Sequence, residues 1–208
     1  MAGLGLGPAD FELFEIVDPG ERAEAVDAAL HPKLKLIAEA CRPGLDRVVG
    51  RPLHLHDARA PRRRGQATEE IMVAFSDSPK GWRGVPYLAV AVSRAHLHAR
   101  VGVKGESLRR GAMGEALRRE AANLARKGKP FRKLRLFDGW NHEELPELAP
   151  AGSTAFWEEL AEAIGPGGDG LDVGIALPAE EARSLALGDL LGVFRDLSPL
   201  YKILSNAE

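Results

Sequence analysis

Residues 86–103 read PYLAVAVSRAHLHARVGV, and this stretch decides the fold. Aliphatic side chains recur at every second position on both sides of the short Ser93-Arg94 link, which is the pattern of a hairpin of two β-strands. Successive side chains of a strand point to opposite faces, so one face here is aliphatic and the other is small, polar and basic. The stretch predicts an antiparallel sheet with two unlike faces.

Segments with the same period of two lie on both sides of this hairpin. They predict four further strands, at 52–56, 70–75, 133–137 and 171–177. Helical spacing predicts a helix at 21–41, broken at His31-Pro32, and a short helical stretch that follows a break at 42–44 and ends at Val49. It also predicts helices at 106–127 and 153–164, one that begins at Pro178, and one at about 190–204. This order predicts one α+β domain over residues 1–208, with a mostly antiparallel sheet of about six strands and helices covering one face.

The bulk composition is that of a globular protein: 208 residues, 45% hydrophobic and 28% charged. Cys41 is the only cysteine and lies among apolar helical positions, which excludes a disulfide framework and a thiolate zinc cluster and favours a buried thiol. No stretch reaches the roughly 20 apolar residues that cross a bilayer, and the first residues lack the basic region of a secretory signal. We expect a cytoplasmic protein with no membrane partner.

Charge is distributed unevenly along the chain. Residues 1–30 carry a net charge of −6, residues 31–143 a net charge of +13, and residues 144–208 a net charge of −9. A basic block of this size indicates an anionic partner, or acidic ends that fold back over the block and pair with it. The sequence leaves both interpretations open.

The second face of the predicted sheet is small, polar and basic. Its members by parity are His54, His56, Met72, Ala74, Tyr87, Ala89, Ala91, His96, His98, Arg100, Lys133 and Arg135. Antiparallel sheets commonly leave one face in water, so solvent exposure is the expectation for this face, and contact with a ligand is the alternative.

Two connections between predicted strands carry basic residues. HDARAPRRRGQ contains Arg59, Arg62, Arg63 and Arg64, and DSPKGWRGVP contains Lys80, Trp82 and Arg83. Guanidinium groups bind phosphate or carboxylate through paired hydrogen bonds, and an aromatic ring beside them can stack on a nucleobase. The two connections indicate an anion site, unless both are solvated turns.

Two His-x-His pairs, His54 with His56 and His96 with His98, raise the possibility of a metal site. Residues i and i+2 of a strand project to the same side, so each pair can present two imidazoles to one ion. All four nitrogens would converge only if the two strands were neighbours. Histidines on a wet sheet face are the favoured interpretation.

Several short motifs, taken in order, resemble one known family. They are DFELFEI (10–16), HPKLK (31–35), HDARAPRR (56–63), MVAFSD (72–77), KGWRGVPY (80–87), AHLH (95–98) and LSPLYK (197–202). Together they resemble the YktB-like family of uncharacterised bacterial proteins, and the resemblance covers nearly the whole chain. It implies a small α+β fold without an established activity.

The resemblance draws attention to particular residues. The family pattern of a histidine, a basic residue and an Arg-Arg pair before a Val-Ala-Phe strand corresponds to His56, Arg59, Arg62 and Arg63, and His96 also matches. A second family histidine would fall at Ala60, and the family's Asn-Pro-Pro turn is replaced by Gly65-Gln66-Ala67. The resemblance supplies no reaction.

A binding protein is favoured over an enzyme, with no cofactor and no catalytic residue, because no Walker, GxGxxG, GxSxG or HExxH motif occurs. The expected anion-binding residues are His56, Arg59, Arg62, Arg63, Arg64, Lys80, Trp82, Arg83, His96, Arg100 and Arg135, with Trp82 or Tyr87 stacking a ring. Nucleic acid is the favoured ligand, followed by a phosphorylated small molecule. The alternatives are a metal-dependent hydrolase using His54, His56, His96 and His98, and a protein-interaction domain with segregated surface charges.

Overall fold

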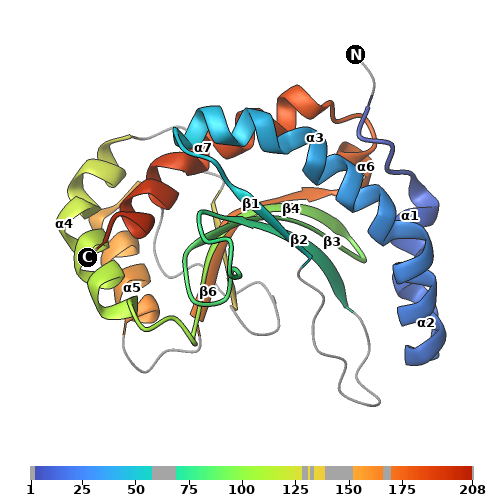
Figure 1. Ribbon diagram of the computed structural model, residues 1–208, viewed down its shortest axis with the longest axis horizontal. Coiled ribbons are helices and arrows are strands. Elements are labelled where there is room, and N and C mark those ends of the chain that lie inside the picture. Colours follow the sequence, from blue (N-terminus) through green and yellow to red (C-terminus); the bar gives the residue numbers. More distant parts are fainter. Residues whose placement is uncertain are drawn as a thin grey trace.

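A six-stranded antiparallel sheet forms the centre of the protein (Figure 1). The computed structural model describes residues 3–57, 69–127, 131, 134–138, 152–165 and 170–207. The strands are β1 (His54–Asp57), β2 (Glu70–Ser76), β3 (Tyr87–Ser93), β4 (His96–Lys104), β5 (Arg135–Asp138) and β6 (Gly170–Pro178). They lie in the order β1-β2-β3-β4-β6-β5, and every neighbouring pair is antiparallel. The predicted α+β class, with a largely antiparallel sheet, is confirmed.

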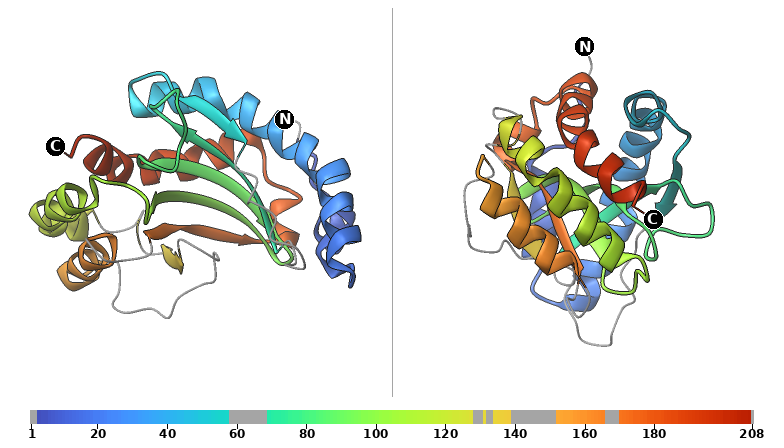
Figure 2. Two further views of the ribbon diagram at one scale, coloured as in Figure 1. Left: turned by 60° about the horizontal axis from the view of Figure 1, so that its bottom comes forward. Right: turned by 90° about the vertical axis from the view of Figure 1, so that its left-hand side faces the viewer.

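Helices cover one face of the sheet and both of its ends. They are α1 (Pro8–Glu12), the 3-10 turn η1 (Leu13–Glu15), α2 (Pro19–Ala25), the π-helical turn η2 (Val26–Leu30), α3 (His31–Val49), α4 (Arg110–Arg126), α5 (Thr154–Ile164), α6 (Ala179–Ala182) and α7 (Leu187–Ser205). Figures 1 and 2 show α3 and α7 lying over one face, with α4 and α5 at one end of the sheet and α1 and α2 at the other. No helix in the described ranges has the length and apolar character needed to span a bilayer.

The aliphatic face predicted by parity is the face that the helices cover. In the register of the sheet, Val73 lies opposite Val90, Val90 opposite Ala99, and Ala99 opposite Ile175. These side chains are buried in one core together with Cys41 of α3 and Phe194 of α7. Burial of this apolar surface is the main favourable contribution to folding.

The two helix breaks predicted at prolines are absent, so that part of the prediction was wrong. α2, η2 and α3 follow one another without interruption from Pro19 to Val49. Pro32 occupies the first turn of α3, where a missing N–H is tolerated, and the π-helical turn comes directly before it. Pro43 lies inside α3, and the helix continues because it packs closely on α7: a Cβ on Gly44 would lie 2.7 Å from the Leu191 methyl carbons.

Candidate functional site

The polar face of the sheet is a single face, as parity predicted, but its centre is not exposed to water. His56, Ala74, Ala89 and Arg100 lie in register across β1 to β4. Arg100 and Ala89 are fully buried, so the expectation of a wet face was wrong for the central strands. A buried charge needs partners, and Arg100 has two carboxylates beside it.

Arg100 lies between the carboxylates of Glu70 and Asp172. Its guanidinium forms ion pairs with Glu70 of β2 and with Asp172 of β6, the latter at 3.4 Å between Nη1 and Oδ2. Burial opposes the charge on Arg100, but the two carboxylates outweigh it and hold the pKa of Arg100 above its usual value. Arg100 thus completes an internal ion-pair cluster, whereas we expected it to contact a ligand.

Tyr87 belongs to the same cluster. Its hydroxyl donates a hydrogen bond to Asp172, and its side chain is fully buried. Burial, reinforced by the Asp172 carboxylate, raises the pKa of Tyr87 well above the usual value, so the phenol keeps its proton. A fully buried ring cannot stack on a ligand, which removes Tyr87 as a stacking platform.

The two basic connections are attached to opposite ends of β2: one leads into the strand and the other leads out of it. β1 ends at Asp57 and β2 begins at Glu70, at the end of the sheet where β3 and β4 are joined, whereas residues 77–86 leave β2 at its other end. Arg59, Arg62, Arg63 and Arg64 lie outside the described residues. Their connection is therefore anchored about the length of a strand away from Lys80, Trp82 and Arg83, and sequence reasoning had combined the two in one site.

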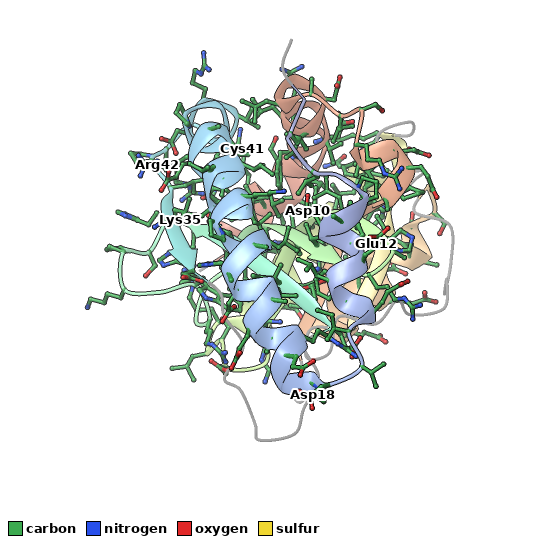
Figure 3. All side chains as sticks on the ribbon, turned by 90° about the vertical axis from the view of Figure 1, so that its right-hand side faces the viewer. Asp10, Glu12, Asp18, Lys35, Cys41 and Arg42 are labelled. Atoms are coloured by element: carbon green, nitrogen blue, oxygen red, sulfur yellow. The ribbon has the colours of Figure 1, made fainter. Side chains whose placement is uncertain are left out.

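At the end where β3 and β4 are joined, helices of the acidic N-terminal region meet the basic middle. Glu15 forms an ion pair with Arg94 (3.1 Å). The two carboxylate oxygens of Asp10 accept hydrogen bonds from Lys33 Nζ at 2.8 and 3.0 Å. Figure 3 shows Asp10 on α1 beside α3. The acidic N-terminal region therefore neutralises part of the basic block within the chain, in agreement with one of the two interpretations of the charge pattern.

The opposite end of the sheet is rich in positive charge, and we call it the basic end. It consists of segments 77–86 and 104–110, which contain Lys80, Arg83, Lys104, Arg109 and Arg110 against Asp77 and Glu106. The two segments are held together by an ion pair between Arg83 and Glu106 (2.7 Å) and by Ser107 Oγ donating to the Gly84 carbonyl (2.9 Å). This end lies beside α4 (Figure 2).

Trp82 lies at the centre of the basic end. Its ring meets Tyr87 edge to face at 4.8 Å, and Arg83 and Lys104 lie over it, with Cζ and Nζ 5.3 and 5.6 Å from the ring centroid. A pocket of about 370 Å³ opens beside it, lined by Ser78, Lys80, Gly81, Trp82, Arg83, Gly84 and Val85. Both predicted cations of this connection therefore line the same concave surface.

His56 is connected to the same end through Ser76. Its Nε2 lies 2.9 Å from Ser76 Oγ, and that hydroxyl lies 3.2 Å from the Ser78 carbonyl oxygen, at the start of the pocket-forming segment. Burial lowers the pKa of His56, and the nearby His54 lowers it further. The structure thus associates His56 with the pocket as a support for its backbone.

The two His-x-His pairs do not converge. β2 and β3 lie between β1 and β4, so the requirement for neighbouring strands is not met. His98 shares a hydrogen bond with Ser93 Oγ (3.0 Å), and its ring is 5.7 Å from that of His96. Within the described residues no group of three His, Cys, Asp or Glu side chains is placed to hold a metal ion. The strand order therefore contradicts the four-imidazole site.

Arg135 lies on the edge strand β5, where its backbone pairs with Gly174 of β6. Strand β6 lies between Arg135 and Arg100 of β4, and the Arg135 side chain lies outside the part of the chain that the structure describes. His96 lies at the start of β4, at the end of the sheet away from the pocket. Of the predicted anion-binding residues, the structure brings together His56, Lys80, Trp82 and Arg83.

Sequence reasoning missed Glu70, Lys104, Glu106 and Asp172. Lys104 has the parity of His98 and Arg100, so extending the β4 pattern by one step would have found it. Glu70 and Asp172 also have the parity of the polar face in the predicted strands 70–75 and 171–177, but only the strand order, which is a tertiary property, places them beside Arg100.

Comparison with known proteins places the chain in a family. The profile of a domain of unknown function, DUF1054, matches residues 7–135. A UPF0637 protein of Oceanobacillus iheyensis is 30% identical over 93 residues, and UPF0637 proteins of Bacillus thuringiensis and Bacillus mycoides are 27% identical over 94 residues. Each alignment covers 45% of this chain and 45% of the relative, so the matched part spans less than half of the relatives' length. The predicted resemblance to uncharacterised bacterial proteins is confirmed, and the chain belongs to the DUF1054 family.

Proposed function

We propose that the protein binds a phosphate-bearing ligand in the pocket at the basic end. The observation that carries the proposal is that Lys80 and Arg83 line one pocket of about 370 Å³. Lys104, Arg109 and Arg110 add positive charge in the adjoining segment. A concave surface with clustered cations attracts anions because it concentrates the electrostatic potential.

Arg83 is suited to exchanging its partner. Its ion pair with Glu106 is half exposed, with 41% of the Arg83 side chain and 51% of the Glu106 side chain accessible to solvent. Exposed ion pairs contribute only about 0–1 kcal/mol. A guanidinium can therefore leave this carboxylate for a phosphate, which it binds through two parallel hydrogen bonds.

Recognition by charge is favoured over recognition by ring stacking. Every aromatic side chain whose surroundings the structure describes is buried: Phe11, Phe14, Phe75, Trp82, Tyr87, Phe131, Phe156, Trp157, Phe194 and Tyr201. Proteins that bind single-stranded nucleic acid without sequence preference need exposed rings on which bases stack. We therefore assign phosphate, and not a base, as the group that this pocket recognises.

Phosphate can come from a nucleic-acid backbone or from a phosphorylated small molecule, and one experiment separates them. Anisotropy of labelled duplex and single-stranded DNA and RNA is measured across a salt series, and calorimetry with inorganic phosphate and pyrophosphate covers small ligands. The test variant is Lys80→Ala/Arg83→Ala. Lys35→Ala/Arg42→Ala is the matched control, because it removes one lysine and one arginine from the exposed side of α3 (Figure 3).

The expected result is binding that weakens with salt and is lost or reduced in the test variant only. For a nucleic acid, each lost phosphate contact should reduce the slope of log affinity against log salt by roughly 0.9. Equal effects of both double variants would show diffuse attraction and contradict the pocket. Binding to none of the probes at low salt would overturn the proposal. An Arg62→Ala/Arg63→Ala variant tests the other basic connection separately.

A further inference from the structure

We propose that Lys104 provides an amine that forms an imine with the carbonyl carbon of a phosphorylated aldehyde or ketone bound at the basic end. The inference rests on the proposed phosphate pocket and adds a chemical class of ligand to it. It is carried by the position of Lys104 in the fold, by its burial, and by the groups that surround its amine.

Lys104 is the last residue of β4 and is 8% exposed. Its Nζ lies 5.6 Å from the ring centroid of Trp82 and 5.8 Å from that of Tyr87. Trp82 in turn lines the pocket with Lys80 and Arg83. The amine is therefore held next to the pocket wall, while two other cations line the pocket itself and are placed to hold a phosphate.

The charge state of Lys104 is adjusted by its surroundings. Burial lowers the pKa of its ammonium group, the carboxylate of Asp172 opposes this effect, and the guanidinium of Arg100 adds to it. Among the described residues, the charged groups that act on Lys104 include Asp172, Arg100, Glu70 and Arg83. A lysine with a lowered pKa presents more of the neutral amine at physiological pH, and the neutral amine is the nucleophile.

The neighbouring hydroxyl and carboxyl groups are of the kind that accompany such a step. Asp172 accepts a hydrogen bond from Tyr87, and the Tyr87 ring is one of the two rings that flank the amine. The phenol keeps its proton and holds the Asp172 carboxylate in place through that hydrogen bond, and a carboxylate beside the amine is a group that can accept a proton as the imine forms. The cluster is therefore a positioned set of a lysine, a tyrosine and an aspartate beside a basic pocket.

The reaction balances without any added oxidant or reductant. The lone pair of neutral Nζ attacks the carbonyl carbon and forms a C–N bond, giving a carbinolamine after proton transfer to oxygen. The C–O bond then breaks, and the oxygen leaves as water with the two protons that Nζ originally carried. The product is the imine, and the phosphate stays with Lys80 and Arg83 throughout.

The test uses pyridoxal 5′-phosphate as the probe. The intact protein is incubated with it and treated with borohydride, which reduces any imine to a stable secondary amine, and the labelled lysine is located by peptide mass spectrometry. Pyridoxal without the phosphate is the matched probe. Lys104→Arg keeps the positive charge but has no reactive amine, and Lys104→Met and Arg83→Ala complete the series, with folding checked by circular dichroism.

We expect Lys104 to be labelled at least several-fold more than any other lysine, with an apparent pKa below the usual value for lysine. Pyridoxal and the Arg83→Ala variant should each reduce that labelling. Phosphate-dependent binding of the probe without label on Lys104 would overturn the imine and leave the phosphate pocket standing. Equal labelling of Lys104 by both probes would support the amine but contradict the pocket. Label spread over exposed lysines such as Lys35 would overturn the inference.

Discussion

The hydroxyl of Tyr87 reaches the carboxylate of Asp172 across a strand that lies between them. Tyr87 is on β3 and Asp172 on β6, and in the register of the sheet both lie opposite Gly102 of β4. Gly102 has no side chain, and a Cβ built on it would collide with the Asp172 carboxylate and with the phenol. The absence of one carbon atom therefore permits a buried hydrogen bond between strands that are not neighbours.

Gly102→Ala should destabilise the protein. The added methyl has to displace Tyr87 or Asp172 in a closely packed region, and overpacking of this kind usually costs about 1–3 kcal/mol. Urea denaturation followed by circular dichroism measures the change in the free energy of unfolding. Gly192→Ala is the control, because no atom lies within 4 Å of its Cβ and it is inside α7. The control should gain about 0.5–1 kcal/mol, and equal effects of both changes would contradict the packing argument.

Arg100→Met should be among the most destabilising single changes. It removes the positive charge between Glu70 and Asp172 and leaves two carboxylates in a buried region. Removing one member of a buried ion-pair cluster typically costs about 3–5 kcal/mol. The triple variant with Glu70→Gln and Asp172→Asn should recover part of this loss, as measured by urea denaturation at pH 7. If the triple variant were less stable than Arg100→Met, the loss would have to come from packing and not from charge.

The stability of the protein should fall on mild acidification partly because of His56. Its pKa is lower in the folded protein than the unfolded value of about 6.5, so the unfolded chain takes up a proton first. This contribution is fully present above pH about 6.5 and is lost as the pH falls through the folded pKa. His56→Gln should therefore show a smaller loss of unfolding free energy between pH 7.5 and pH 5 than the unmodified protein.

The control for this pH effect is His96→Gln. His96 lies on the same face of the sheet but at its other end, without contact to Ser76. The same reduction in both variants would show that the effect is not specific to His56.

Asp10→Asn should destabilise the packing of α1 against α3. The carboxylate of Asp10 is 5% exposed, accepts from the Gly7 backbone N–H at 2.8 Å, and pairs with Lys33. Asparagine keeps an acceptor for the backbone but loses the charge, and hydrogen bonds to charged groups contribute roughly 1.5–3 kcal/mol. Glu15→Gln removes the charge from an exposed pair with Arg94 and should change stability by less than about 1 kcal/mol. Thermal and urea denaturation of the two variants test the contrast, which would vanish if Asp10 were held by the cap alone.

The sequence by itself determined the sheet and its two faces. Strand alternation depends only on the backbone period of two, so the parity of Val90 and of Arg100 could be assigned from the letters alone. The start of the helix predicted at 153–164 was equally local: Ser153 lies directly before α5, and its hydroxyl accepts a hydrogen bond from the Phe156 N–H at 3.3 Å. Local rules failed where tertiary packing outweighed them, as at Pro43, where contact with α7 holds the helix together.

Only the tertiary structure decided which charges meet. The order β1-β2-β3-β4-β6-β5 places Asp172 beside Arg100 and separates the two histidine pairs, and no sequence spacing encodes that order. The hydrogen-bonded register also anchors the connection that carries Arg62 and the one that carries Arg83 at opposite ends of β2. Charge composition is a property of the chain, whereas an anion site is a property of distances, and distances between remote residues exist only once the sheet has assembled.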